Sequence, residues 1–568
     1  MKTSLEAALQ QSVEKLLDTH GLHAEISVQL QRPKLKEHGD YAANVAMNLA
    51  GLLKRDPRAI AETLIAQTMW PDSVEKTEIA GAGFINIRLK AAAEADVLKM
   101  IVAQSSRYGS VEPLTNAQPI CLEFVSANPT GPMHVGHGRG AVVGDVLGRI
   151  LASQGYSVHR EYYINDAGAQ IGVLAESVWL RIRELQGEAI DFPEKAYPGE
   201  YIVEIAKSLL TEKDYDELCA LSEAARFSWI SQRAIDANMA MIRGDLAAMN
   251  IHFDHFFSEQ QLHQSNQVND LLDNLKQKGQ IYRGMLPPPK GKEVEDYQAT
   301  EQWLFRTTEF GDDVDRPVEK HDGTPTYFAA DIAYHFDKFN RGYRKQIDIW
   351  GADHGGYITR VQSAMKALTG LEQQPEVLLV QMVNLTRNGE MVRMSKRAGT
   401  FVTLREVVDE VGSDAVRFNF MTRRIESQLE FDLEVAKKKS DENPVYYVQY
   451  AHARICSILR KAASEQVAMD HIDTIDTSLL ISDEEQALIT QLLAFPELLA
   501  RAAEQREAYR LAIYLMQLAQ SLHSFYHKHR VICDEPTLTA ARLLLITAVK
   551  HTLHNGLSLI GVQSPEEM

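Results

Sequence analysis

Cysteine is scarce in this chain. Its 568 residues include four, at positions 121, 219, 456 and 533. No two of them are spaced as a Cys-x-x-Cys zinc knuckle or as the dense disulfide framework of a small secreted domain. Three histidines, His523, His527 and His529, have ligand-like spacing but no cysteine or carboxylate cluster beside them. We therefore expect reduced thiols, a cytoplasmic location and no protein-bound zinc or other metal.

Long apolar stretches are also missing. No uninterrupted run approaches the ~20 residues that a bilayer-spanning helix needs. At the N-terminus an acidic residue, Glu6, precedes any apolar segment of the kind found in signal peptides. We expect neither export nor a membrane partner.

Positive charge is in the minority. Lys and Arg total 59 against 77 Asp and Glu, which gives a formal net charge of −18. This balance argues against a protein that coats nucleic acid generally, although one local basic surface could still bind it. With 45% hydrophobic and 24% charged residues the composition is that of a globular protein. At roughly 150 residues per domain, the length predicts three or four domains.

The hydrophobic pattern changes twice along the chain. Residues 1–112 combine helical periodicity with an alternating run at 83–89, which predicts a small α+β domain. In residues 113–430 short apolar strand candidates at 120–125, 158–163, 346–350 and 377–382 alternate with helices, which predicts parallel βαβ units. The segment 167–272 reads as a helical insertion. Residues 431–568 carry periodic leucines almost throughout and predict a separate all-α domain.

The most informative stretch is a turn between a strand and a helix. The apolar strand ends at Val125, a turn with the sequence Asn-Pro-Thr-Gly-Pro follows, and a helix begins near His134. A helix N-terminus presents unpaired N–H groups and a positive dipole end, both of which favour phosphate. His134 and His137 project from one face of this helix, and Gly136 lets a nucleotide approach the backbone. The alternative is that both histidines are capping or core residues, and the surrounding turn favours the phosphate site.

A second candidate element is the basic loop 393–400, with the sequence Arg-Met-Ser-Lys-Arg-Ala-Gly-Thr. A glycine-flanked loop that carries Arg393 and Lys396 can close on a triphosphate and stabilise the charge on leaving pyrophosphate. Alone, this loop would be read as a solvated basic segment. Its pairing with the histidine turn favours a role in phosphate chemistry.

These motifs resemble the two signatures of class I aminoacyl-tRNA synthetases. His134-Val-Gly-His137 is similar to the His-x-Gly-His turn, and Arg393-Met-Ser-Lys-Arg397 to the Lys-Met-Ser-Lys-Ser loop. Four further stretches, 123–137, 327–331, 414–417 and 559–568, resemble the arginyl-tRNA synthetase family over nearly the whole chain. Arg393 and Arg397 depart from the loop pattern. Gly131 stands where many arginyl enzymes carry a compensating lysine, so Lys396 is expected to supply the cation.

The resemblance implies a fold and a reaction. The expected fold is α/β, with a Rossmann-like catalytic domain at 113–430, a tRNA-contacting domain at 1–112 and an anticodon-binding domain at 431–568. The reaction joins L-arginine to tRNA(Arg) through an arginyl-adenylate and consumes ATP, with Mg²⁺ accompanying the ATP. The implied partners are L-arginine, ATP and tRNA(Arg), and we expect a monomer.

The resemblance also assigns roles at matching positions. The expected catalytic residues are His134, His137 and Lys396. The expected ATP-binding residues are His134, Gly136, His137, Asp353, Met394, Ser395 and Lys396. The expected arginine-binding residues are Glu123, Asn128, Tyr327, Asp331 and His354. The expected tRNA-binding residues are Phe84, Asn86, Tyr446, Tyr450 and Arg454.

Residue chemistry supports part of this assignment. A guanidinium is planar and permanently charged, so selecting arginine needs a carboxylate. Tyr327 and Asp331 are four apart on a predicted helix and share a face, although such a pair alone is usually a surface feature. Asp353 and His354 follow a strand, where open α/β sheets bind ligands, but a turn of this kind is commonly structural.

The aromatic stripe in the C-terminal region has two interpretations. Tyr446, Tyr450 and Arg454 could stack on splayed anticodon bases. About half of such stripes are instead part of a core.

Two other functions compete with that of a synthetase. One is a catalytically silent tRNA-binding paralogue, and the other is a small nucleotidyltransferase, which would not account for the two flanking domains.

Overall fold

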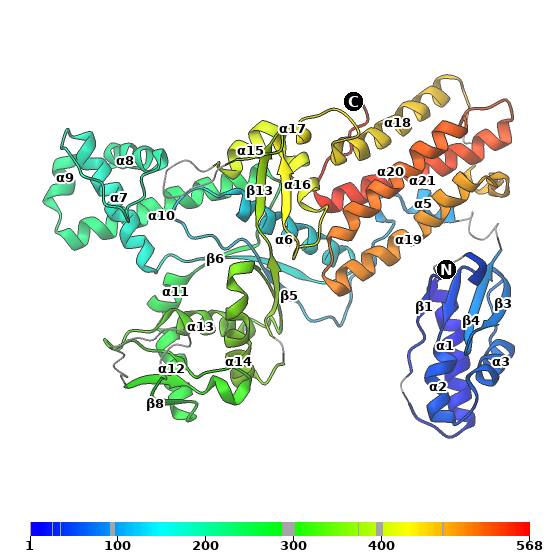
Figure 1. Cartoon of the computed structure of the whole chain (residues 1–568), viewed down its shortest axis with the longest axis horizontal. Helices are drawn as coiled ribbons and strands as arrows, with labels where there is room; N and C mark the ends of the chain where they lie inside the picture. Colours follow the sequence, from blue (N-terminus) through cyan, green and yellow to red (C-terminus); the bar gives the residue numbers. More distant parts are fainter. Residues whose placement is uncertain are drawn as a thin grey trace. The chain divides into compact units, whose positions relative to one another are not determined.

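The structure is a computed structural model, and it describes residues 2–24, 26–33, 36–90, 97–286, 301–372, 374–392, 402–467 and 471–568 (Figure 1). The chain packs as two compact units. The first contains Met1–Ser105, Ile458–Ala494 and Ser521–His551, and the second contains Ser106–Ser457, Phe495–Gln520 and Thr552–Met568. No helix in the described ranges is long and apolar enough to cross a membrane.

The N-terminal part of the first unit is an α+β domain, as predicted. Its four-stranded antiparallel sheet has the order β1-β2-β4-β3. The strands are β1 (Leu30–Gln31), β2 (Tyr41–Ala43), β3 (Val74–Ala80) and β4 (Phe84–Leu89), and the helices are α1 (Lys2–Thr19), α2 (Val45–Leu53) and α3 (Pro57–Gln67). Leucines of α1 and α2 and isoleucines of β4 form one buried core.

The second unit is built on a parallel sheet of the order β12-β11-β5-β6-β7. Its strands are β5 (Ile120–Glu123), β6 (Val158–Ile164), β7 (His255–Ser258), β11 (Lys345–Gly351) and β12 (Glu376–Val380). All four residues of β5 are buried, as expected for a central parallel strand that is covered on both faces. The strand order reverses between β5 and β11, and open α/β sheets bind ligands at such a switch point.

A helical insertion follows β6. It consists of α7 (Ala169–Leu185), α8 (Glu200–Glu212), α9 (Tyr215–Ala220) and α10 (Glu223–Ala248). These helices bury their own apolar cluster, which includes Leu174, Ile202 and Ile230. The prediction of a helical insertion is confirmed, with one difference. Strand β7 lies inside the segment that we expected to be helical and extends the central sheet.

A second inserted layer follows β7. Its helices are α11 (Glu259–Gln264), α12 (Gln267–Gln277), α13 (Tyr327–Asn340) and α14 (Ile358–Thr369). They pack with an antiparallel sheet of β10 (Arg316–Pro317), β9 (Glu301–Phe305) and β8 (Ile281–Met285). Buried residues of α12, α13 and this sheet share one core.

After β12 the chain forms a small mixed sheet. Strand β13 (Val383–Arg387) pairs antiparallel with β14 (Glu390–Met391) and parallel with β15 (Leu429–Asp432). Three short helices accompany it: α15 (Leu404–Val411), α16 (Ser413–Phe420) and α17 (Leu433–Ala436).

The remainder of the chain is helical, which confirms the expected all-α region. Its long helices are α18 (Pro444–Ser464), α19 (Asp483–Gln505), α20 (Tyr509–Lys528) and α21 (Pro536–Ile560). Each of these helices contributes residues to both compact units.

Candidate functional site

The turn after β5 has a strained backbone. Val125 and Ser126 adopt φ values of 70° and 39°, in the left-handed region that residues with a side chain rarely enter. The Ser126 hydroxyl donates to Glu123 Oε1 at 2.8 Å and accepts from the backbone N–H of Tyr163 at 3.1 Å. Strain of this kind costs about 1–3 kcal/mol per residue and persists where the surroundings fix the conformation. Here it directs the chain from β5 toward the start of α6 (Val135–Ser153).

The two histidines cap this helix reciprocally. The backbone N–H of His137 donates to His134 Nδ1, and that of His134 donates to His137 Nδ1, each at 3.4 Å. The two rings stack with centroids 3.6 Å apart. A ring nitrogen that accepts a hydrogen bond carries no proton, so each neutral imidazole has its proton on Nε2. The capping and phosphate-binding interpretations are therefore compatible, because the cap uses Nδ1 of each ring and not Nε2.

Gly136 is required by the ring of its neighbour. A Cβ at position 136 would lie 3.0 Å from both Cε1 and Nδ1 of His134. A side chain at this position would therefore crowd the His134 ring, which would have to shift by a few tenths of an ångström within the reciprocal cap.

The basic loop lies outside the described residues. This applies to Arg393, Met394, Ser395, Lys396 and Arg397. The chain returns to the described part beside the histidine turn. Thr403 forms an antiparallel bridge with His134, and the N–H of Leu404 donates to the carbonyl of Met133 at 2.8 Å. Residues 403 and 404, the first part of the chain described after the basic loop, are thus tied to the start of α6.

Asp331 lies one turn into α13, as the predicted spacing requires. Its Oδ2 accepts a hydrogen bond of 2.6 Å from the hydroxyl of Tyr357. Burial raises the pKa of Asp331 to about 7, the Tyr357 hydrogen bond opposes this, and the charges of Glu259 and Glu123 add to it. Tyr327, at the start of the helix, is 57% exposed, and its hydroxyl accepts from the N–H of Ala169 at 3.4 Å.

A further carboxylate, that of Glu259, acts electrostatically on Asp331 and was not among the predicted site residues. Glu259 is 4% exposed at the start of α11, directly after β7, and burial raises its pKa. Tyr163 is 8% exposed, and its pKa is raised by burial and then by the charges of Glu259, Asp331 and Glu123. The charges of three carboxylates, Glu259, Asp331 and Glu123, therefore act on this one tyrosine of β6. Such a concentration of negative charge favours a cation.

A buried lysine also fixes the position of the Glu123 side chain. Lys338 is fully buried, and its Nζ lies 2.6 Å from Glu123 Oε2 and 3.0 Å from Asp348 Oδ1. The same ammonium lies 4.3 Å from the ring centre of Tyr334. One cation thus compensates two buried carboxylates, and the position of Glu123 depends on it.

The other residues that we predicted to bind arginine or ATP in this part of the chain lie at the surface. Asn128 is exposed, and its amide donates to Gln170 Oε1 at 2.9 Å. Asp353 and His354 are also exposed, 3.6 Å apart, in a 3-10 helix over Ala352–Tyr357 that follows β11. The same short helix carries Tyr357, so its position is coupled to that of Asp331.

Comparison with known proteins identifies the family of this chain. Residues 3–89 match the arginyl tRNA synthetase N terminal domain, residues 97–424 the catalytic domain of class I (R) tRNA synthetases, and residues 448–568 the DALR anticodon binding domain. The chain belongs to the arginyl-tRNA synthetase family.

Relatives of the family match over the full length. The arginine–tRNA ligase of Magnetococcus marinus is 47% identical, with 100% of both chains covered, and that of Syntrophotalea carbinolica is 44% identical with the same coverage. The solved arginyl-tRNA synthetase of Thermus thermophilus superposes with a TM-score of 0.73, covers 100% of both chains and is 23% identical, which shows the shared fold.

The aromatic stripe of the family's anticodon-binding region lies along α18. Tyr446 and Tyr450 stack with centroids 6.2 Å apart and planes 7° from parallel. Tyr450 is 41% exposed and Arg454 is also exposed, so this end of the stripe is not part of a core.

The two N-terminal candidates lie in different environments on β4. Phe84 is 41% exposed, whereas Asn86 is 8% exposed. Phe84 therefore offers an exposed ring for base stacking, whereas the side chain of Asn86 is buried in the N-terminal domain.

Proposed function

We propose that this chain is an arginine–tRNA ligase. It uses ATP to activate L-arginine as arginyl-adenylate, transfers the arginyl group to tRNA(Arg), and releases AMP and diphosphate. The observation that carries this proposal is the grouping of two buried carboxylates, Glu123 at the end of β5 and Glu259 at the start of α11, with the half-buried Asp331 of α13. Membership of the arginyl-tRNA synthetase family supports the same reaction.

The histidine turn handles the phosphates. The Nε2–H groups of His134 and His137 donate to phosphate oxygens as charge develops on them, and the N-terminus of α6 adds its positive dipole end. Lys396 neutralises the leaving pyrophosphate. Gly136, Asp353, Met394 and Ser395 complete the proposed ATP site. Mg²⁺ enters with ATP and neutralises phosphate charge.

The carboxylate group selects the amino acid. Asp331 pairs with the arginine guanidinium, and Tyr357 fixes the orientation of the Asp331 carboxylate. Glu123 and Glu259 add negative charge close by. Tyr327, Asn128 and His354 are proposed to contact the remainder of the arginine. A neutral side chain would leave the Asp331 carboxylate without a cation, which disfavours most other amino acids.

The affinity for arginine should depend on pH. In the empty site Asp331 has a pKa of about 7, so the carboxylate that the guanidinium needs is lost as the pH falls through 7. We expect the KM for arginine to rise about tenfold between pH 8 and pH 6, because the ionised fraction falls by that factor. The measurement is KM for arginine against pH, with KM for ATP as the control. A flat arginine profile would contradict the assignment. Tyr357→Phe should move the profile to higher pH, because its hydrogen bond favours the carboxylate.

Gly136 provides a second test. Gly136→Ala should slow ATP–pyrophosphate exchange by about tenfold to a hundredfold, because the new Cβ displaces the His134 ring. Stability should not fall, since alanine favours a helix. Gly140→Ala on the same helix is the matched control, because a Cβ there meets nothing within 4 Å. Equal rates for the two variants would count against the role of the ring.

The tRNA contacts are proposed to come from the flanking domains. We propose boundaries at residues 1–112, 113–430 and 431–568, with Phe84 and Asn86 contacting tRNA from the first domain and Tyr446, Tyr450 and Arg454 from the last. We further propose that the protein acts as a monomer in the cytoplasm.

Charging assays test the function directly. Purified protein is offered each of the twenty amino acids with tRNA(Arg), and ATP–pyrophosphate exchange is measured with and without the tRNA. We expect charging with arginine alone. His137→Ala and Lys396→Ala should each lose most of the rate while folding normally. A silent paralogue would give tRNA binding without exchange or charging, and that result would sink the proposal.

A further inference from the structure

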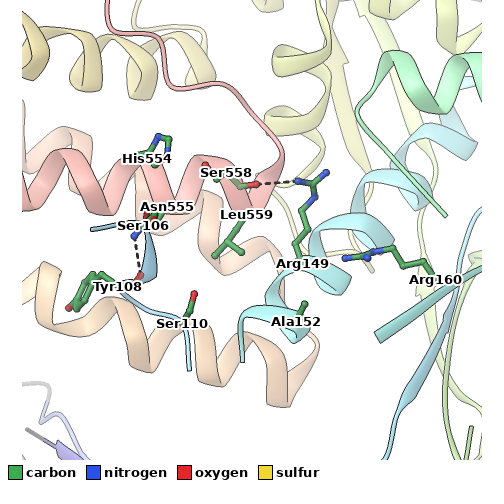
Figure 2. Close-up of a pocket in the computed structure, with 10 residues that line it drawn as sticks. All are labelled: Ser106, Tyr108, Ser110, Arg149, Ala152, Arg160, His554, Asn555, Ser558 and Leu559. Carbon is green, nitrogen blue, oxygen red and sulfur yellow. Dashed lines mark hydrogen bonds between the residues drawn. The ribbon is translucent and has the colours of Figure 1, made fainter. Parts of the chain in front are cut away.

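A second group of cationic side chains lies at the far end of α6. A cavity of about 310 Å³ opens between residues 106–110, the last turns of α6, Arg160 on β6 and the last turn of α21 (Figure 2). Two guanidiniums, one imidazole and three serine hydroxyls line it. None of the ten described residues that form its wall is acidic. This composition differs from that of the carboxylate group that we propose for arginine.

Arg160 has no ion-pair partner among the residues that the structure describes. Its Nε is buried and has no hydrogen-bond partner in the described part of the chain, and no ion pair joins its guanidinium to a described carboxylate. Asp254 bonds only the backbone of residue 160: its carboxylate accepts from the Arg160 N–H at 2.7 Å, and its own N–H donates to the Arg160 carbonyl at 2.9 Å. A partly buried guanidinium without a partner is costly, so this position favours an anion.

The neighbouring helix is shaped around this side chain. A Cβ at Gly148 would lie 3.0 Å from Nε and 3.5 Å from Nη2 of Arg160, so the guanidinium lies against α6 where a side chain is missing. Figure 2 shows the Arg160 side chain directed toward the helix that carries Arg149.

Arg149 is fixed at the wall of the cavity. Its guanidinium donates to Asp145 Oδ2 and to the carbonyl of Asn250, each at 2.8 Å, and reaches the carbonyl of Ser558 at 3.5 Å. These contacts hold one cation at the cavity edge while Arg160 remains available. A preorganised pair of guanidiniums is the arrangement that binds phosphate oxygens well.

We propose that this cavity binds a phosphate group. The Arg160 fork and the hydroxyls of Ser106, Ser110 and Ser558 donate to the phosphate oxygens. The site is separate from that for ATP: Arg149 follows the His134 cap by 15 positions on one helix, a separation of about 22 Å at 1.5 Å per residue.

Two sources share this chemistry. The phosphate is either a backbone phosphate of tRNA or part of a free phosphorylated small molecule. The first source rests on the proposed function, and the second does not. The last turn of α21 lies in the region that matches the anticodon binding domain, so a tRNA phosphate bound here would join that region to the catalytic sheet.

The test uses the full chain with Arg160→Gln, and Arg233→Gln as the matched control. Arg233 already pairs with Glu212 at 2.9 Å, so its loss removes the same charge without emptying the cavity. One arm measures tRNA(Arg) affinity over a range of salt concentrations. The other measures the thermal stabilisation given by inorganic phosphate relative to chloride at equal ionic strength. If the glutamine variant does not fold, Arg160→Met replaces it, because methionine also removes the charge and keeps a long side chain.

Each source predicts its own result. If the phosphate comes from tRNA, Arg160→Gln weakens tRNA binding about fivefold to tenfold and lowers the salt dependence by about one ion, while Arg233→Gln changes neither. If it comes from a small molecule, phosphate stabilises the wild type and the control but not Arg160→Gln, and tRNA binding is unchanged.

The proposal is overturned if Arg160→Gln matches the control in both arms. Failure of the wild type to charge tRNA would instead count against the proposed function and leave the inorganic phosphate arm intact.

Discussion

Asp331→Asn should remove nearly all charging with arginine. The substitution keeps the size of the side chain but removes the charge that pairs with the guanidinium at a half-buried position. Breaking such a pair costs about 3–5 kcal/mol, so kcat/KM for arginine should fall about a thousandfold. The measurement is steady-state aminoacylation with arginine as the varied substrate.

The KM for ATP should be unchanged in this variant. Thermal stability should hold or rise, because burial disfavours the charged form of Asp331 and the amide removes that cost. Asp337→Asn is the matched control, since Asp337 lies on the same helix and pairs with Arg341 at 2.7 Å, away from the carboxylate group. If Asp331→Asn kept its arginine kcat/KM within threefold of the wild type, the arginine site would have to lie elsewhere.

Lys338→Met should have the largest effect on stability. The fully buried ammonium compensates both Glu123 and Asp348, and its loss leaves two carboxylates without a counter-charge. We expect a loss of about 3–5 kcal/mol in the free energy of unfolding, measured by urea denaturation. Lys366→Met is the control, because Lys366 is 38% exposed and pairs with Glu372 at the surface.

A double variant separates stability from positioning. Asp348→Asn added to Lys338→Met removes one of the two orphaned charges, so part of the lost stability should return. The KM for arginine should be raised in both Lys338→Met and the double variant, because Glu123 lacks in each the cation that holds it. A Lys338→Met protein as stable as the Lys366→Met control would show that the network contributes little.

Local sequence patterns were sufficient for much of this fold. The strand candidates at 120–125, 158–163, 346–350 and 377–382 correspond to β5, β6, β11 and β12. The alternation of these strands with helices can be predicted from local sequence, because each strand is marked by a short run of apolar residues. The spacing of Tyr327 and Asp331 also fixed their common face once α13 was assumed.

Strand β7 was missed because it is only four residues long and lies within a segment of helical periodicity. Glu259 was missed with it. Had the run at 255–258 been taken as a strand, Glu259 would have stood at its carboxyl end and become a candidate ligand.

Other features depend on contacts between distant residues. Lys338 and Glu123 are 215 positions apart, so no local pattern joins them. The pKa of Asp331 depends on burial and on Tyr357, which is brought close by packing rather than by spacing. That the Arg160 guanidinium has no ion-pair partner among the described residues can be recognised only from the positions of the neighbouring carboxylates in the structure.

The mutual cap of His134 and His137 has a genetic consequence. Because the two rings stack with centroids 3.6 Å apart, removing either ring leaves the backbone hydrogen bond to its partner but takes away the ring packed against it. The two positions therefore behave as one mutational target: an allele that loses the first histidine gains little further defect when it loses the second. Selection would therefore act on both histidines together, and keeping one of them would not make a substitution of the other tolerable.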